Sequence, residues 1–420
     1  MREKLPFSKS DVLKWEESYP TPFYVYDEEG IVNCVKALYD AFSWNKGYKE
    51  YFAVKATPTP GILRVLRDLG CGTDCASIPE LVMSDRCGMS GHSIMFSSNE
   101  TRIDEYQEAV KLGAIINLDD VTQIEQLERA GEIPDTICCR YNPGSFENTN
   151  GIMGHAYDSK FGMTYEQLKE AYTKLKAKGV KHFGIHSMVA SCSLDNNYYP
   201  SLVRELFNIA VKFRDELGIE ISFVDLSGGI GIPYKPEDPV IDIAKVGEGV
   251  HKAYTEVVEA HGMEISIFTE MGRYITGPYG YLVTKVIGEK HIYKDYVGVD
   301  ATACNLMRPA IYGSYHHIRV LGKEDAPNEI KVDVVGSLCE NNDKFAVDRE
   351  LPKVEYGDLI VIEDAGAHGH SMGYNYNGKL RSAELLMHKD NSVTCIRRAQ
   401  TMEDYFATLD VDAEFTSKEG

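Results

Sequence analysis

Long apolar segments are absent from this 420-residue sequence. No apolar run reaches the roughly eighteen residues that a membrane-spanning helix needs. The N-terminal stretch MREKLPFSKSDVLKW is charged and mixed, without the apolar core of a secretion signal. These absences predict a cytoplasmic protein that has no membrane partner.

Basic residues are scarce as well. The chain has 44 Lys and Arg against 64 Asp and Glu, which gives a formal net charge of −20 at pH 7. Such a charge repels phosphate backbones, so nucleic acid is not expected as a partner. A small anionic substrate stays compatible, because a few local arginines can outweigh a distant field.

The ten cysteines lack the paired spacing of a metal site. Cys71 and Cys75 are separated by three residues and the pair at 138–139 is adjacent, but neither has a matching second half. A disulfide framework is unusual in a large cytosolic chain. The histidine groups His316–His317 and His368–His370 have no carboxylates at ligand spacing. We expect reduced, mostly buried thiols and no bound metal.

Eight short apolar or β-branched runs alternate with helical patterns such as TYEQLKEAYTKLKAKGV. This alternation predicts an α/β fold, a parallel (β/α)₈ barrel of the TIM type. A doubly wound sheet is the alternative, although such a sheet more often has fewer strands. The eight runs are YFAVKA (51–56), GTDCAS (72–77), SIMFSS (93–98), AIINLDD (114–120), TICCRYNP (136–143), HFGIHSMVA (182–190), FVDLSGGIGI (223–232) and SIFTEMGR (266–273).

The pattern changes after about residue 280. GYLVTKVIGEK, EIKVDVVG, DLIVIEDAG and SVTCIRR are typical of strands joined by turns, which predicts a β-rich barrel or sandwich domain over residues 280–420. The early run PFYVYD (22–27) predicts that residues 1–34 add a strand to that domain. Residues 35–279 then form the barrel.

Functional groups of such a barrel lie where the strands end. Lys55 ends the first strand, between apolar residues that would desolvate its amine and favour the neutral, nucleophilic form. A lone lysine at this place is more often a surface residue whose amine reaches solvent. The residues by themselves leave both interpretations open.

Two further groups follow the last two strands. The run SGGIG at 227–231 can close backbone N–H groups around a phosphate, or can simply form a tight turn. Glu270 could hold the proton of a pyridine nitrogen, and Arg273 could bind a phosphate or carboxylate. A structural Glu–Arg pair is equally compatible with this spacing.

Ten motifs in order make the pattern specific. The chain resembles the fold-type III pyridoxal 5'-phosphate (PLP) decarboxylases, which have an alanine racemase-like barrel, and within them the diaminopimelate decarboxylases. The resemblance covers nearly the whole chain from residue 21 to about residue 385. The motifs are PTPFYVYD, YFAVKA, TDCASIPEL, KFGM, GIHSMVASCSLD, DLSGGIGIPY, EMGRYITGPYG, RPAIYGSYH, GSLCENND and AGAHGHSMGYNYNGKLR.

The resemblance implies a role for each matching residue. Lys55 carries PLP and Glu270 pairs with the ring nitrogen, while Cys339 donates a proton and enters the site from the partner subunit of a homodimer. The implied cofactor-binding residues are Lys55, His186, Met188, Ser191, Gly228, Gly229, Glu270, Gly272, Arg273 and Tyr376. The implied substrate-binding residues are Arg273, Arg308, Tyr312, Glu340 and Tyr376.

One position departs from the family's pattern. The sixth-strand motif has Met188 where the family usually has a histidine that packs on the cofactor ring. Methionine can still make a sulfur–ring contact but forms no strong hydrogen bond. His186 lies two residues earlier, so on an extended strand it would face the same side.

The resemblance implies decarboxylation of meso-2,6-diaminopimelate to L-lysine and CO₂. Arg308 and Tyr312 would bind the distal carboxylate and Glu340 the distal ammonium group. Ornithine, lysine or arginine decarboxylation on the same fold is the alternative, since TDCAS also resembles the ornithine enzymes. A PLP-dependent racemase or a non-catalytic PLP-binding protein is a further alternative.

Overall fold

The computed structural model describes residues 4–145 and 156–410. They divide into two compact units, which we describe one at a time. The first unit comprises the described residues of Asp27–Tyr279 and Gly366–Ser371, and the other described residues belong to the second. The first unit begins before residue 35, the predicted start of the barrel, because helix α2 (Glu28–Ala41) packs against a barrel helix.

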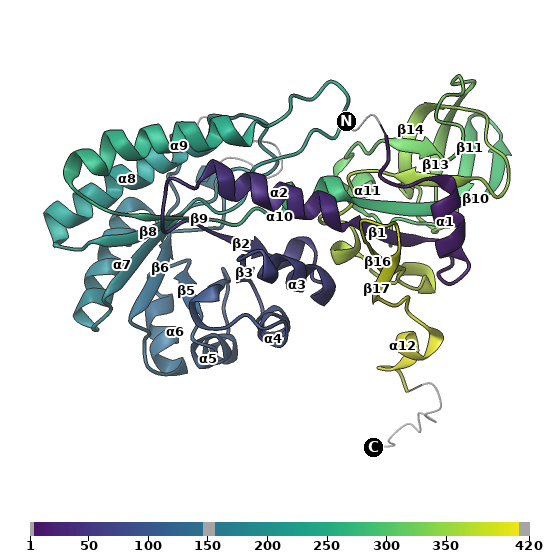
Figure 1. Ribbon diagram of the computed structural model, residues 1–420. Coiled ribbons are helices and arrows are strands. Elements are labelled where there is room, and N and C mark those ends of the chain that lie inside the picture. Colours follow the sequence, from purple (N-terminus) through teal and green to yellow (C-terminus); the bar gives the residue numbers. More distant parts are fainter. Residues whose placement is uncertain (1–3, 146–155, 411–420) are drawn as a thin grey trace, which may run out of the picture. The chain divides into compact units, whose positions relative to one another are not determined.

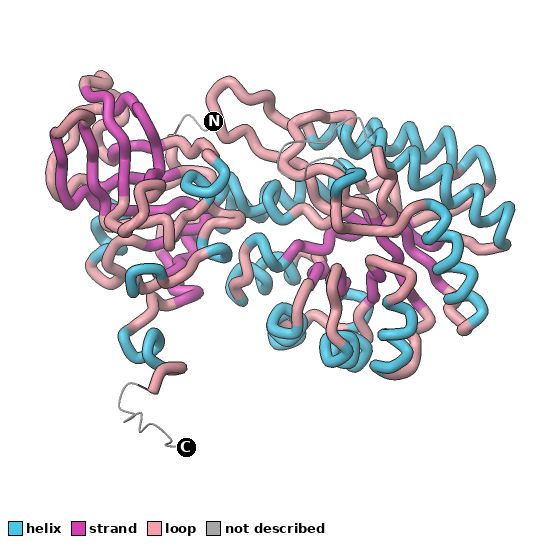
Figure 2. Tube along the Cα trace, turned by 180° about the vertical axis from the view of Figure 1, so that it is seen from behind, coloured by secondary structure: helices cyan, strands magenta, loops and turns pink. Residues whose placement is uncertain are grey.

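The first unit confirms the predicted barrel. Eight parallel strands close on themselves in chain order, and each overlaps one of the eight predicted runs. Figure 2 shows these strands surrounded by helices. The strands are β2 (Lys49–Ala53), β3 (Gly72–Cys75), β4 (Ile94–Ser97), β5 (Ile115–Leu118), β6 (Thr136–Arg140), β7 (His182–His186), β8 (Ile221–Asp225) and β9 (Ser266–Thr269).

A helix follows every barrel strand (Figure 1). Local sequence sets their ends: Thr164 and Gln167 form a capping box that starts α7, and Gly218, at φ +58°, ends α8. None of the helices that the structure describes is long and apolar enough to cross a membrane. The helices are α3 (Pro60–Asp68), α4 (Ile78–Arg86), α5 (Ile103–Lys111), α6 (Gln123–Ala130), α7 (Tyr165–Ala177), α8 (Tyr198–Leu217), α9 (Ile243–Val257) and α10 (Gly272–Thr276).

Inward-facing side chains from different strands fill the barrel. Tyr51, Met95, Ile115 and Phe223 belong to one buried cluster, as expected for a packed barrel core. Gly184 makes room for it, because a Cβ at this position would lie 2.1 Å from the Phe223 ring. The filled interior leaves the strand ends as the place for chemistry.

The second unit is a mixed β-sheet domain, which confirms the predicted β-rich character. Strand β10 pairs with β1, β11 and β15, and the N-terminal strand β1 thereby joins the sheet. The strands are β1 (Phe23–Asp27), β10 (Gly280–His291), β11 (Asp295–Val299), β12 (Ile318–Val320), β13 (Ile330–Val335), β14 (Lys344–Leu351), β15 (Leu359–Ile362), β16 (Ala383–Met387) and β17 (Val393–Arg397). The helices are α1 (Lys9–Glu16), α11 (Arg308–Tyr312) and α12 (Met402–Phe406).

Alternate residues of these strands form the core of the second unit. Phe23 and Val25 of β1 join Val283 of β10 in one buried cluster, which also contains Trp15 of helix α1. Tyr24 and Tyr26, which alternate with them on β1, are buried as well, so this strand is covered on both faces.

Candidate active site

A pocket lies at the carboxyl ends of strands β2, β7, β8 and β9. All its lining residues belong to the first unit, and most of the predicted cofactor-binding residues are among them. They are Ala53, Lys55, Met188, Ser191, Cys192, Ser227, Gly228, Gly229, Ile230, Glu270, Met271, Gly272, Arg273 and His368. The location agrees with the rule that barrel sites are built from loops after the strands.

Lys55 lies in a short 3₁₀ turn, Val54–Ala56, directly after β2. Its apolar neighbours are buried, but its own side chain is 51% exposed, and Nζ is 4.0 Å from Asp74 Oδ2. The expectation that these neighbours desolvate the amine is therefore wrong, because they point into the core while the lysine points into the pocket. The amine can reach a ligand there.

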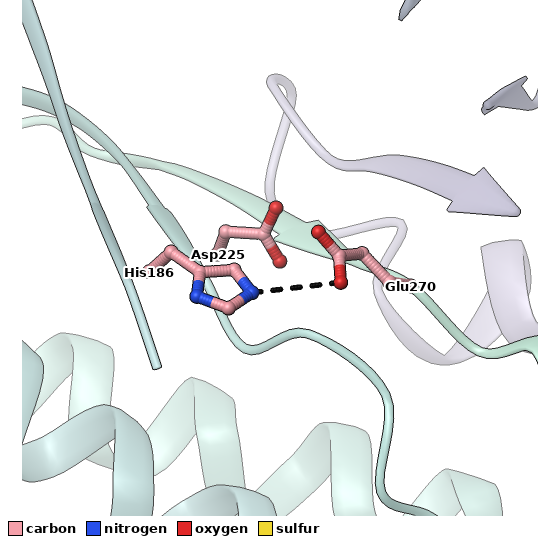
Figure 3. A group of neighbouring side chains, drawn as sticks. All are labelled: His186, Asp225 and Glu270. Carbon is pink, nitrogen blue, oxygen red and sulfur yellow. Dashed lines mark ion pairs between the residues drawn. The ribbon is translucent and has the colours of Figure 1, made fainter. Parts of the chain in front are cut away.

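Glu270 is the centre of a buried polar cluster (Figure 3). Ser227 donates a hydrogen bond from Oγ to Glu270 Oε2 over 2.7 Å, and His186 Nε2 lies 3.5 Å from the same oxygen. Asp225 points toward both side chains, and one ligand atom from each of His186, Asp225 and Glu270 lies within 4.8 Å of the others. Strands β7, β8 and β9 thus bring three titratable groups together.

The environment assigns different charges to these groups. Burial opposes ionisation of Glu270, but His186, Lys55 and the Ser227 hydroxyl stabilise the anion and lower its pKa to about 2. Burial and the charge of Glu270 raise the pKa of Asp225 well above its ordinary value. Burial also lowers the pKa of His186. As the pH rises, Glu270 therefore loses its proton before Asp225 does.

Glycines line the wall of the pocket at places where a side chain would collide with backbone or with a neighbouring residue. A Cβ on Gly228 would lie 2.7 Å from Glu270 O, and one on Gly229 would lie 2.7 Å from Ala190 O. Gly229 also has φ +99°, which L side chains rarely adopt. A Cβ on Gly272 would lie 2.6 Å from Ala56 Cβ. The bare backbone that results can approach a phosphate closely.

Arg273 is buried beside this backbone. Its Nη1 donates a hydrogen bond to the Tyr234 hydroxyl over 2.6 Å, and its guanidinium lies 5.9 Å from the centre of the Tyr234 ring. Arg273 thus has a fixed orientation at the pocket wall.

The remaining candidates lie in the second unit. Arg308 is buried in α11, donates to Ser314 Oγ over 3.2 Å, and lies over the Tyr312 ring at 5.8 Å. Tyr312 and Tyr376 are about half exposed. Cys339 and Glu340 are exposed neighbours in the loop between β13 and β14. They line a separate cavity of about 690 Å³ within this unit.

The sequence did not single out several polar residues of the pocket region. Asp225 and Asp74 stand at the ends of β8 and β3, and Arg140 at the end of β6 donates to Asp119 over 3.4 Å. Their position at strand ends could have identified them as candidate site residues. His368 was noted only as one of a histidine group inside a family motif. Its place in the pocket was not predicted, because segment 366–371 joins the first unit through tertiary contacts.

Comparison with known proteins decides the family. The sequence pattern described as "Pyridoxal-dependent decarboxylase, pyridoxal binding domain" matches residues 30–277. The chain belongs to the pyridoxal-dependent decarboxylases.

Relatives of this decarboxylase match it over most of its length. It is 39% identical to Protein TabA of Pseudomonas amygdali pv. tabaci over 388 residues, which is 92% of this chain and 91% of that protein. It is 34% identical to the diaminopimelate decarboxylase of Methanothermobacter thermautotrophicus over 97% of this chain and 96% of that protein. The crystal structure of diaminopimelate decarboxylase from Helicobacter pylori complexed with L-lysine has a TM-score of 0.86 at 30% identity, covering 94% of this chain and 98% of that chain.

The pocket fits the PLP cofactor of this decarboxylase family. Oε1 of Glu270 is buried and has no hydrogen-bond partner among the described residues, so it can receive a proton-bearing ring nitrogen. The wall around Gly228, Gly229 and Gly272 offers bare backbone for a phosphate. Lys55 supplies an accessible amine for the aldehyde.

Proposed function

We propose that this decarboxylase converts meso-2,6-diaminopimelate to L-lysine and CO₂. The observation that carries the proposal is Glu270, a buried carboxyl with a lowered pKa and one oxygen open to a ligand, in the same pocket as Lys55. An anion at this place stabilises a protonated ring nitrogen, which is what removal of an α-carboxylate requires.

When bound, PLP supplies a protonated ring that takes up the electron pair left at the α-carbon. Lys55 holds the cofactor, and Glu270 keeps the proton on the ring nitrogen. Ser191, Gly228, Gly229, Gly272 and Arg273 would bind its phosphate, and Met188 and His186 would contact its ring. Ser227 and His186 orient Glu270 through the contacts described above.

Arg308 supports diaminopimelate as the substrate. A buried guanidinium binds a carboxylate well, and a site built for that charge rejects an analogue that lacks it. Arg308 and Tyr312 bind the distal carboxylate, and Glu340 binds the distal ammonium group. Arg273 and Tyr376 are the further substrate-binding residues of this proposal. The named diaminopimelate decarboxylases among the relatives support the same substrate.

A substrate panel tests this assignment. The decarboxylase should release CO₂ from meso-diaminopimelate with a higher kcat/KM than from L-ornithine, L-lysine or L-arginine. Chiral analysis of the product should find L-lysine, whereas a racemase would return diaminopimelate stereoisomers without CO₂. Comparable turnover of L-ornithine would overturn the substrate, and isomerisation alone would overturn the reaction.

A homodimer with shared sites is the second part of the proposal. The partner subunit's Cys339 donates the proton that the α-carbon needs after CO₂ leaves. Cys339 supports this role because seven of the ten cysteines are buried and Cys339 is the exposed one. All ten are free thiols, which also supports a reducing compartment such as the cytoplasm.

Mixing two inactive variants tests the shared site. Lys55→Ala and Cys339→Ala enzymes should each be nearly inactive. After co-refolding, about half of the dimers are hybrids with one doubly damaged and one intact site, so about a quarter of all sites should recover. A tag on one variant verifies that hybrids form. Verified hybrids without recovered activity would show that Cys339 acts within its own chain.

A further inference from the structure

Glu50 is a fully buried carboxyl that the reaction scheme above does not use. It lies on β2, at the seam where β2 and β9 close the barrel. The backbone pairing across this seam consists of Lys49 with Phe268 and Glu50 with Thr269, so it ends just before Glu270. Beyond Thr269, the Glu50 side chain provides the hydrogen bonds between β2 and the segment after β9.

Both oxygens of Glu50 bond the segment that contains Glu270. The Thr269 hydroxyl donates to Oε2 over 2.5 Å, and the Met271 backbone N–H donates to Oε1 over 2.7 Å. Thr269 and Met271 are the two neighbours of Glu270 in the chain. Glu50 therefore fixes the backbone on both sides of Glu270.

The opposite side of Glu270 is held by Ser227. The Glu270 N–H donates to Ser227 O over 2.8 Å, and the Ser227 hydroxyl donates to the Glu270 side chain. Glu270 is thus held between the β8 loop and β2. Ser227 directs the carboxylate itself, whereas Glu50 directs the backbone from which that carboxylate projects.

We propose that Glu50 is a positioning residue, which sets the direction of the Glu270 carboxylate toward the cofactor ring. The proposal rests on the proposed role of Glu270. It adds that this role depends on a second carboxyl from the opposite side of the barrel seam.

The charge of Glu50 is compatible with this role. Burial raises its pKa to about 8, and the negative charge of Glu270 acts in the same direction. At neutral pH the carboxyl is mostly protonated, so it does not repel Glu270. In the protonated form Oε1 still accepts from the Met271 N–H, whereas the Oε2–H donates to the Thr269 hydroxyl, which can accept as well as donate. The amide of glutamine offers the same one acceptor and one donor.

The chain offers a matched control at the same seam. Asn45 is buried before β2 and crosses to the start of β9, where Nδ2 donates to Ile265 O over 3.0 Å and Oδ1 accepts from Ile267 N over 3.3 Å. It makes the same kind of bonds as Glu50, but to residues three and five positions before Glu270 and not to the two neighbours of Glu270. Loss of Asn45 therefore reports on the stability of the seam alone.

The experiment compares Glu50→Ala, Glu50→Gln and Asn45→Ala with the wild-type enzyme. PLP is titrated into each apo-protein, and its affinity and visible absorbance are recorded together with the thermal midpoint, kcat and KM. Glu50→Ala should weaken PLP binding, alter its absorbance and lower kcat about 10²-fold with little change in KM, because misplacement of a catalytic group has this effect. Glu50→Gln should restore most of these values.

Asn45→Ala should lower the thermal midpoint but leave PLP absorbance and kcat near wild type. The proposal is overturned if both alanine variants lose kcat equally, if Glu50→Ala keeps wild-type absorbance and kcat, or if Glu50→Gln is as damaged as Glu50→Ala. Should Glu50→Ala fail to fold, Thr269→Val removes one arm of the contact and must show a smaller loss in the same direction. Because the PLP readouts need no substrate, they test Glu50 even if diaminopimelate is not decarboxylated.

Discussion

The candidate residues of the two units differ in how much of their side chains is exposed to solvent. In the barrel, His186, Asp225, Glu270 and Arg273 are buried, and each has a fixed neighbour at a strand end. In the second unit, Tyr312, Cys339, Glu340 and Tyr376 are exposed, and only Arg308 of the five candidates is buried. Most of the proposed cofactor-binding residues therefore lie in the first unit, whereas the proposed substrate-binding residues of the second unit are, apart from Arg308, exposed.

This difference is what the proposed roles of the two groups predict. A cofactor that stays through many turnovers can be held by buried groups whose orientation folding sets in advance. A substrate must enter and leave, so its contacts remain accessible until they are used. Variants in the barrel should consequently change the reaction of every substrate, whereas variants in the second unit should change the choice among substrates.

The largest effect is expected for Glu270→Gln. The amide keeps the size of the side chain and can still accept from Ser227, but it loses the charge that holds a proton on the ring nitrogen. We expect kcat to fall about 10²–10³-fold, as for the loss of a preorganised electrostatic partner. The fall should be similar for any amino acid that the enzyme decarboxylates, and wild-type kcat in this variant would contradict the assignment of Glu270.

Arg308→Ala should instead affect kcat/KM differently for different substrates. We expect kcat/KM for meso-diaminopimelate to fall by an amount equivalent to ~2–4 kcal/mol, because a buried charge partner is lost. Any residual turnover of L-lysine or L-ornithine, which lack a distal carboxylate, should be unaffected. Steady-state kinetics on the panel measures both. An equal loss for all substrates would mean that Arg308 supports the fold rather than the specificity.

Two buried acids, one from each unit, should respond to pH in opposite ways. Glu50 in the barrel has a pKa raised from 4.5 to about 8 by burial, so folding binds its proton. Its contribution to stability is complete below pH 4.5 and is lost as the pH rises to about 8. Over this range wild type should lose on the order of 1 kcal/mol of unfolding free energy per pH unit relative to Glu50→Gln.

Asp333 in the second unit provides the opposite case. Burial opposes its ionisation, but Lys294 at 2.6 Å and Lys344 at 3.0 Å lower its pKa below 3.8. Its contribution is present above that pH and is lost only in acid. The test measures the unfolding free energy of wild type, Glu50→Gln and Asp333→Asn from pH 5 to 8. The difference between wild type and Glu50→Gln should change with pH over this range, whereas the difference between wild type and Asp333→Asn should stay constant. A constant difference for Glu50→Gln would contradict its raised pKa.

The smallest effect is expected for Met188→His. Met188 lines the pocket at the place where the family usually has histidine. A sulfur–ring contact contributes about 0.3–1.5 kcal/mol, and a stacked imidazole can replace it. PLP titration of the apo-protein should give the same or a tighter dissociation constant. Loss of PLP binding would show that neighbouring residues have repacked around methionine.

The barrel was predictable because its pattern repeats. Each strand run was apolar and each following helix had its own amphipathic period, so eight local signals supported one architecture. In the second unit the sequence signalled β1, β10, β13, β15 and β17 but not β11, β12, β14 and β16. The missed strands are short or interrupted by glycine and charges, and their conformation depends on cross-strand partners.

The pocket was predictable where chemistry and strand ends coincide, as at Glu270 and Gly229. The exposure of Lys55 could not be predicted, because a run of apolar neighbours does not reveal which way the side chain between them points. Glu50 was missed, and Ser227 was noted only as part of the SGGIG run, for a related reason. Their importance lies in hydrogen bonds across the barrel, to residues 219 and 43 positions away in the chain, and no local pattern encodes that pairing.

The most direct test follows CO₂ release as PLP is added to apo-enzyme in the presence of meso-diaminopimelate. We predict that CO₂ and L-lysine appear in equal amounts, in proportion to bound PLP, and that borohydride fixes the cofactor to the peptide containing Lys55. Lys55→Ala should give only the background rate at every PLP concentration. Recovery of the label on another lysine, or CO₂ release that does not depend on PLP, would contradict the proposed site and reaction.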